Sequence, residues 1–128
     1  MRKRLIGFAL AVAGVMTLGP VSSWAHHSMS MFDRDKEITL EGVVKEFQYT
    51  IPHAWLLIDV TNEDGTVTTW GFESSSRTAL RLRGVRANTF QPGMKVSVTG
   101  NPMRDGRPAG LWLNTVTEDG TVWDVEGL

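Results

Sequence analysis

The stretch from Glu41 to Val60 constrains the fold more than any other part of the chain. It is typical of two β-strands, with alternating apolar residues, joined at a corner formed by Thr50-Ile51-Pro52. The alternation of the first strand, which starts at Ile38, changes phase across Gly42, and this predicts a β-bulge that coils a long strand around a barrel corner. The second strand, Ala54 to Val60, has one core face, and its other face is partly covered or binds a ligand.

The remaining elements are predicted from turn residues and from alternation. They are a third strand at Thr66–Glu73, a short helix at Arg77–Arg83, a fourth strand at Lys95–Gly100, a fifth strand around Leu111–Val116, and a short return through Val122 and Trp123. Three strands, a helix and two strands form the element order of the OB-fold, a five-stranded Greek-key barrel. The sequence therefore predicts a mainly-β, OB-like barrel with one short helix between strands three and four. A β-sandwich is the alternative.

The first 25 residues have the pattern of a secretory signal peptide. A basic start precedes an apolar run from Leu5 to Leu18, which is short for a membrane span, and Ser23-Trp24-Ala25 fits the small-x-small cleavage rule. We expect cleavage after Ala25, with a cut after Ser23 as an alternative, and a periplasmic protein that meets the membrane only during export. The predicted organisation is a signal peptide at 1–25, an extended arm at 26–36 and the barrel domain at 37–128.

Charge and cysteine content exclude several classes of function. Loss of the signal peptide would remove three basic residues and change the formal net charge from −1 to −4, whereas a general nucleic-acid binder needs a basic surface. The chain has no cysteine, which excludes thiolate catalysis, iron–sulfur clusters and cysteine zinc sites. No nucleophile motif, phosphate-binding glycine loop or H-E-x-x-H pattern is present. We therefore expect a binding or accessory protein and not an enzyme.

A set of short motifs resembles a known family. They are H-H-S at 26–28, F-D at 32–33, T-L-E-G-V-V-K-E-F at 39–47, P-H-A-W at 52–55, W-G-F-E at 70–73, L-R-L-R-G at 80–84, P-G-M-K-V-S-V-T-G-N-P at 92–102 and V-T-E-D-G-T at 116–121. Together they resemble a family of small exported bacterial proteins catalogued only as a domain of unknown function. The resemblance covers nearly the whole mature chain and implies a periplasmic OB-like barrel. His26, His27 and His53 match it by position, while Met29 and Met31 depart from its pattern.

The three histidines predict a metal site. His26 and His27 begin the expected mature chain, and His53 lies in the P-H-A-W corner. A terminal amine and imidazole nitrogens suit copper, nickel and zinc, and the thioethers of Met29 and Met31 suit cuprous ion. We expect one copper ion at these five residues. Because His26 and His53 precede and follow the first strand, the arm is expected to fold back along that strand if both bind one ion. A polar arm without metal, with His53 bonded to a loop carbonyl, is the alternative.

Aromatic residues on the strands suggest a different function. Trp55 and Trp70 lie on the second and third strands, where OB-folds stack ligands on exposed aromatic side chains. They predict a site for an oligosaccharide, a peptide or a small aromatic ligand, without metal. Tryptophans also fill the cores of small barrels, which is the competing interpretation.

Overall fold

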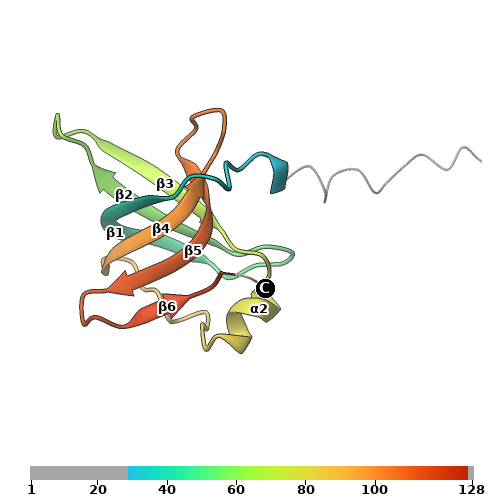
Figure 1. Ribbon diagram of the computed structural model, residues 1–128. Helices are drawn as coiled ribbons and strands as arrows, with labels where there is room; N and C mark the ends of the chain where they lie inside the picture. Colours follow the sequence, from blue (N-terminus) through green and yellow to red (C-terminus); the bar gives the residue numbers. More distant parts are fainter. Residues whose placement is uncertain (1–28, 127–128) are drawn as a thin grey trace, which may run out of the picture.

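The computed structural model describes residues 29–126, which form one small barrel (Figure 1). Its elements are β1 (Ile38–Gln48), β2 (Trp55–Thr61), β3 (Val67–Glu73), α2 (Arg77–Leu82), β4 (Lys95–Pro102), β5 (Ala109–Thr117) and β6 (Val122–Asp124). The sheet order is β3-β2-β1-β4-β5-β6, and a parallel pairing of β3 with β5 closes the barrel. The predicted OB-like barrel with a short helix between the third and fourth strands is confirmed, and the sandwich alternative is wrong.

β1 coils because it pairs with two strands in succession. Its first half pairs with β4 and its second half with β2, and Val43 pairs with both Asp59 and Lys95. The bulge lies between Val44 and Glu46, so its predicted position at Gly42 is wrong by a few residues. Gly42 has another role, because a Cβ there would stand 2.7 Å from the carbonyl oxygen of Asp59. Glycine therefore permits β2 to approach β1 closely where β1 turns towards β4.

The barrel interior is filled by buried apolar side chains from β1 to β5, the half-buried Trp123 of β6 packs against them, and α2 closes one end. Ala79 and Leu80 of α2 point inward, and the helix begins where the Ser76 hydroxyl accepts a hydrogen bond from the Ala79 N–H at 3.0 Å. The core cluster consists of Val44, Ala54, Leu56, Ile58, Phe72, Leu80, Val85, Phe90, Val96, Val98, Trp112 and Val125. Trp112 thus serves packing, in agreement with the interpretation of tryptophans as core residues.

The arm before β1 packs on the barrel. Phe32 forms a β-bridge with Met103 and is only 2% exposed. Together with Leu111 and the half-buried Ala109, these two residues form a second apolar cluster, separate from the main core. The described part of the arm, residues 29–36, therefore continues past the end of β4 and lies against the hairpin of β4 and β5. Within residues 29–126, no helix is both long enough and apolar enough to cross a membrane.

Candidate functional site

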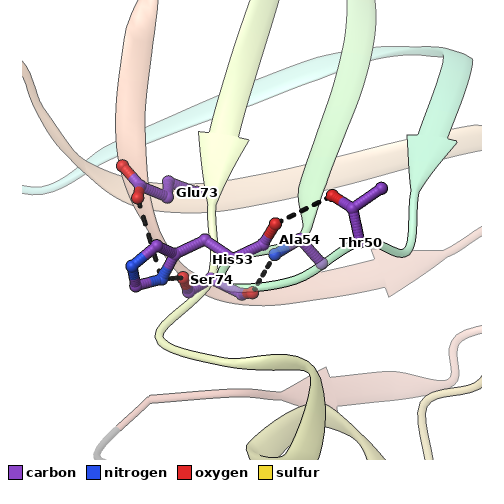
Figure 2. Close-up of polar contacts among 5 residues, drawn as sticks. All are labelled: Thr50, His53, Ala54, Glu73 and Ser74. Atoms are coloured by element: carbon purple, nitrogen blue, oxygen red, sulfur yellow. Dashed lines mark hydrogen bonds and ion pairs between the residues drawn. The ribbon is translucent and has the colours of Figure 1, made fainter.

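His53 lies in the loop between β1 and β2, held against the end of β3. The Thr50 hydroxyl donates to the His53 carbonyl at 3.0 Å, across a loop that contains a cis Ile51–Pro52 bond. The next residue, Ala54, donates its N–H to the Ser74 hydroxyl oxygen at 3.1 Å and accepts from the Ser74 N–H at 2.9 Å. These reciprocal bonds fix the start of β2 against the residue that follows β3, so the position of His53 is determined by two strands (Figure 2).

The orientation of the His53 ring leaves one nitrogen available. Nδ1 lies 2.9 Å from the Ser74 carbonyl oxygen, which can only accept, so Nδ1 carries the hydrogen and donates. In the neutral ring Nε2 then keeps its lone pair, as in metal-bound histidines, whose other ring nitrogen usually donates to a carbonyl or carboxylate. The His53 side chain is 36% exposed. A partly exposed imidazole held by Nδ1 is suited to bind a metal ion, or to accept a hydrogen bond, through Nε2.

Glu73 is the acidic neighbour of His53. Its Oε1 lies 3.8 Å from His53 Nδ1, and its side chain is only 12% exposed (Figure 2). Burial raises the pKa of the Glu73 carboxyl above its usual value, and the charge of His53 opposes that rise. Glu73 pairs across the sheet with Trp55 and beside Leu111 of β5. The site therefore lies where β3 and β5 close the barrel.

These two residues do not form a complete metal centre. Among the residues that the structure describes, no group of three histidine, aspartate or glutamate side chains is arranged to hold a metal ion. His53 supplies one nitrogen ligand. The carboxylate of Glu73 lies beside Nδ1 of the His53 ring and interacts with the ring itself. An ion at Nε2 would need further ligands from another segment.

The structure describes only three of the five predicted metal ligands. Met29 and Met31 are each 40% exposed on the arm, and His53 is in the corner loop. His26 and His27 lie outside the described residues. Over residues 29–36 the arm does not run back along β1, because its backbone hydrogen bonds join it to Pro102 and Arg104 at and beyond the end of β4. It packs instead beside β5, the strand that pairs with β3 at Glu73.

Trp55 and Trp70 lie on opposite faces of the hairpin formed by β2 and β3. Trp70 pairs with the buried Ile58 and stacks on Phe72 with ring centroids 6.3 Å apart, so it belongs to the interior. The half-buried Trp55 is on the outer face, where ring atoms lie 3.3–3.4 Å from the position that a Cβ on Gly71 would take. The structure thus does not bring the two predicted stacking residues together, and Trp55 alone faces outward.

A groove of about 510 Å³ lies elsewhere on the barrel. It runs over the outer side of β1, β2, β4 and β5, with Val43, Lys95 and Val116 in its lining. None of the predicted site residues lines it. Its acidic side chains, Glu41 and Glu118 among them, do not form a metal-binding group with their neighbours.

Glu73 and Ser74 are the site residues that the sequence did not reveal. Glu73 was recognisable as a strand carboxylate in W-G-F-E, but no rule of spacing pairs it with a histidine twenty residues earlier. The structure places P-H-A-W and W-G-F-E side by side, with Trp55 opposite Glu73. The pairing register of β2 and β3 brings the two motifs together, and this register cannot be predicted from a single sequence.

The fold and the site define a small OB-like barrel protein. One histidine, whose ring is oriented by a hydrogen bond, lies where β3 and β5 close the barrel. The model of the Family of unknown function (DUF6152) matches residues 14–126, and the chain belongs to this family. The resemblance found in the sequence is thereby confirmed. No curated protein matches the chain significantly. No solved structure does so either.

Proposed function

We propose that this protein is an exported, periplasmic accessory protein that binds one copper ion and catalyses no reaction. The His26 amine and ring hold the ion, His53 or His27 supplies a further nitrogen, and Met29 or Met31 assists when the ion is reduced. The observation that carries the proposal is the orientation of His53, whose Nδ1 donates to Ser74 and leaves Nε2 for a ligand. The roles of His26 and His27 in this proposal rest on the sequence alone.

Copper is favoured over other metals by the chemistry of the ligands. Copper heads the affinity order of divalent ions for nitrogen sites, and thioethers favour its reduced form. An exported chain without cysteine offers amine, imidazole and thioether groups as its soft and borderline ligands. Two thioethers on the arm, both partly exposed, are accessible to an ion.

The pH dependence of binding follows from the ligands. An α-amino group titrates near about 7.7–8.0 and an ordinary imidazole near about 6.5, and both must lose a proton to bind. Binding should therefore release protons and weaken as the pH falls below about 6. Calorimetry in buffers of different ionisation enthalpy measures the number of protons released.

The decisive experiment is a calorimetric titration of cupric ion into three samples. They are the authentic mature protein beginning at His26, the same protein with its terminal amine acetylated, and His53→Ala. Acetylation should abolish the site, because it converts the terminal amine into an amide nitrogen. His53→Ala should lower the affinity by roughly 10- to 100-fold, the range seen when a supporting group of a metal site is lost.

Two outcomes separate the ligands. An unchanged affinity in His53→Ala, with loss in the acetylated protein, would assign the third nitrogen to His27. Equal affinities in all three samples would contradict copper binding through the histidines.

A second candidate function rests on Trp55. Its indole lies over Gly71 on the outer face, between cross-strand neighbours Gln48 and Glu73. An aromatic platform flanked by an amide and a carboxylate suits an oligosaccharide, a peptide or a small aromatic ligand. Trp55→Ala should abolish binding to such a ligand and Trp55→Phe should retain part of it, as measured by NMR titration. The absence of shifts around Trp55 across a ligand panel would remove this candidate.

A further inference from the structure

Three arginine side chains lie around α2 without an acidic partner. They are Arg77, Arg81 and Arg86, and none of them forms an ion pair within residues 29–126. Of the seven other basic residues in this range, six form ion pairs with carboxylates: Lys36, Lys45, Arg83, Lys95, Arg104 and Arg107. The chain between β3 and β4, residues 74–94, contains four arginines and no aspartate or glutamate. This end of the barrel is therefore basic, although the chain as a whole has a formal net charge of −1.

The backbone and one aromatic ring hold the three arginines close together. Arg77 and Arg81 are four residues apart on α2 and so lie on one face of the helix. Arg86 Nη1 donates to the Arg81 carbonyl at 2.8 Å and to the Val85 carbonyl at 3.2 Å. The Arg77 guanidinium lies 5.8 Å from the centre of the Tyr49 ring. Because like charges repel each other, an anionic partner would stabilise this arrangement.

Two exposed aliphatic side chains lie at the same end of the barrel. Leu82, the last residue of α2, is 75% exposed, and Ile51 in the loop between β1 and β2 is 71% exposed. These are the largest exposed fractions among the large apolar side chains of the described residues. The loop lies beside α2 (Figure 1), and the Tyr49 hydroxyl joins the two by donating to the Val85 carbonyl at 3.2 Å. The α2 surface is defined here as Ile51, Arg77, Arg81, Leu82 and Arg86.

Arginines beside projecting aliphatic side chains match the chemistry of an anionic lipid surface. Lipid phosphates accept hydrogen bonds from guanidinium groups, and the boundary between headgroups and acyl chains accommodates aliphatic side chains. Peptide partners usually bind in grooves or along free strand edges. The groove of about 510 Å³ contains no residue of the α2 surface. Leu82 and Ile51 project instead from a helix end and a loop, where a fluid surface can receive them.

We propose that the α2 surface docks reversibly on an anionic membrane surface, with its three arginines against lipid phosphates and with Leu82 and Ile51 at the acyl boundary. This goes beyond copper binding and differs from the expectation that the protein meets the membrane only during export. A six-residue helix with two aliphatic side chains is too small for stable anchoring, so the association depends on charge and on salt. Physiological salt screens charges beyond about 8 Å, so the arginines in contact outweigh the acidic residues elsewhere on the barrel.

The test is co-sedimentation of authentic mature protein with lipid vesicles, without added metal. The protein should bind phosphatidylglycerol vesicles at low salt, be released at high salt, and leave phosphatidylcholine vesicles unbound. The double variant Arg77→Gln/Arg81→Gln should lower the partition coefficient by roughly fivefold for each arginine removed. The matched control is Arg104→Gln/Arg107→Gln, which removes the same charge from the hairpin of β4 and β5 and should have a much smaller effect.

A second pair of variants tests the aliphatic contact. Leu82→Ser should weaken binding to phosphatidylglycerol vesicles severalfold. Val67→Ser is the matched control, because Val67 is 60% exposed at the start of β3, in a hairpin that points away from α2 (Figure 1). All of the substituted side chains are exposed, and unchanged melting temperatures would verify that the variants fold.

The outcomes decide between a membrane and other partners. Binding to neither kind of vesicle would overturn the proposal, and binding to polyglutamate alone would assign the surface to an acidic protein instead. Equal losses in the two double variants would show an effect of net charge and would also overturn it. Because no metal is added, the result is independent of whether the protein binds copper.

Discussion

The indole of Trp112 has one polar atom in the core, Nε1, and the hydroxyl of Thr115 accepts its hydrogen bond. Trp112 Nε1 donates to Thr115 Oγ1 at 2.8 Å, and both residues are buried. Thr115→Val keeps the shape but leaves the N–H without a partner, so the free energy of unfolding should fall by about 1–3 kcal/mol. Thr115→Ser keeps the acceptor and should cost less. Urea denaturation measures both, and equal losses would contradict a role for the hydrogen bond.

Glu73 should make the metal-free protein less stable as the pH rises. Because burial raises its pKa in the folded state, the folded protein holds this proton more tightly than the unfolded chain. Its contribution is fully present below the ordinary pKa, near 4.5, and is lost as the pH rises through the raised value. Glu73→Gln should remove that loss, and the exposed Glu46→Gln is the matched control.

Thermal unfolding of the three proteins between pH 4 and 7 checks this prediction. The melting temperature of the wild-type protein should fall relative to that of Glu73→Gln as the pH rises. Parallel curves for all three would mean that burial of Glu73 has no energetic effect.

The residue type and its place in the sequence predicted His53 as a candidate ligand. They did not predict which residues surround its ring. A lone histidine in a proline corner was visible in the sequence. Its partners, Ser74 and Glu73, are contributed by the end of another strand, and their approach depends on the register of β2 and β3. A one-residue change of register would place different side chains there, so local sequence could not supply the pair.

The hairpin of β4 and β5 allows a test of packing at a glycine. A Cβ on Gly100 would stand 2.5 Å from the Leu111 carbonyl oxygen and 2.8 Å from Phe72 Cδ1. Gly100→Ala should therefore destabilise the protein by about 3 kcal/mol through overpacking. Gly106 in the same hairpin has φ +80° and open space around it, so Gly106→Ala should cost only about 1–2 kcal/mol. Similar losses in denaturant titrations would contradict the close approach at Gly100.

Element boundaries were largely predictable because alternation and turn residues agree with each other. The helix predicted at 77–83 is observed at Arg77–Leu82, and the strand predicted at 66–73 is observed at Val67–Glu73. The β-bulge was predicted at the wrong residue. Glycine is favoured both at a phase shift of the alternation and where two strands approach closely, so its presence did not distinguish the two. At Gly42 the close contact with β2 is the reason.

At the scale of the whole molecule, element order predicted the barrel, but the packing of the arm was not foreseen. Phe32 and Met103 stand in segments without periodicity, and their contact joins residues about seventy positions apart. Alternation patterns describe the faces of strands. They do not describe side chains outside strands that pack on a closed barrel, and the contact of Phe32 with Met103 is of this kind.

The export that we propose for this protein is tested by cleavage of its first 25 residues. Ser23 and Ala25 occupy the two small positions of the cleavage rule, while the position of Trp24 between them is unrestricted. We therefore predict that protein recovered from the periplasm begins at His26, and intact mass spectrometry measures this directly. Ala25→Gln should block processing, whereas Trp24→Gln should leave it unchanged. A periplasmic species that retains residues 1–25 would contradict export by cleavage and, since the His26 amine would then be a peptide nitrogen, would also remove the terminal chelate.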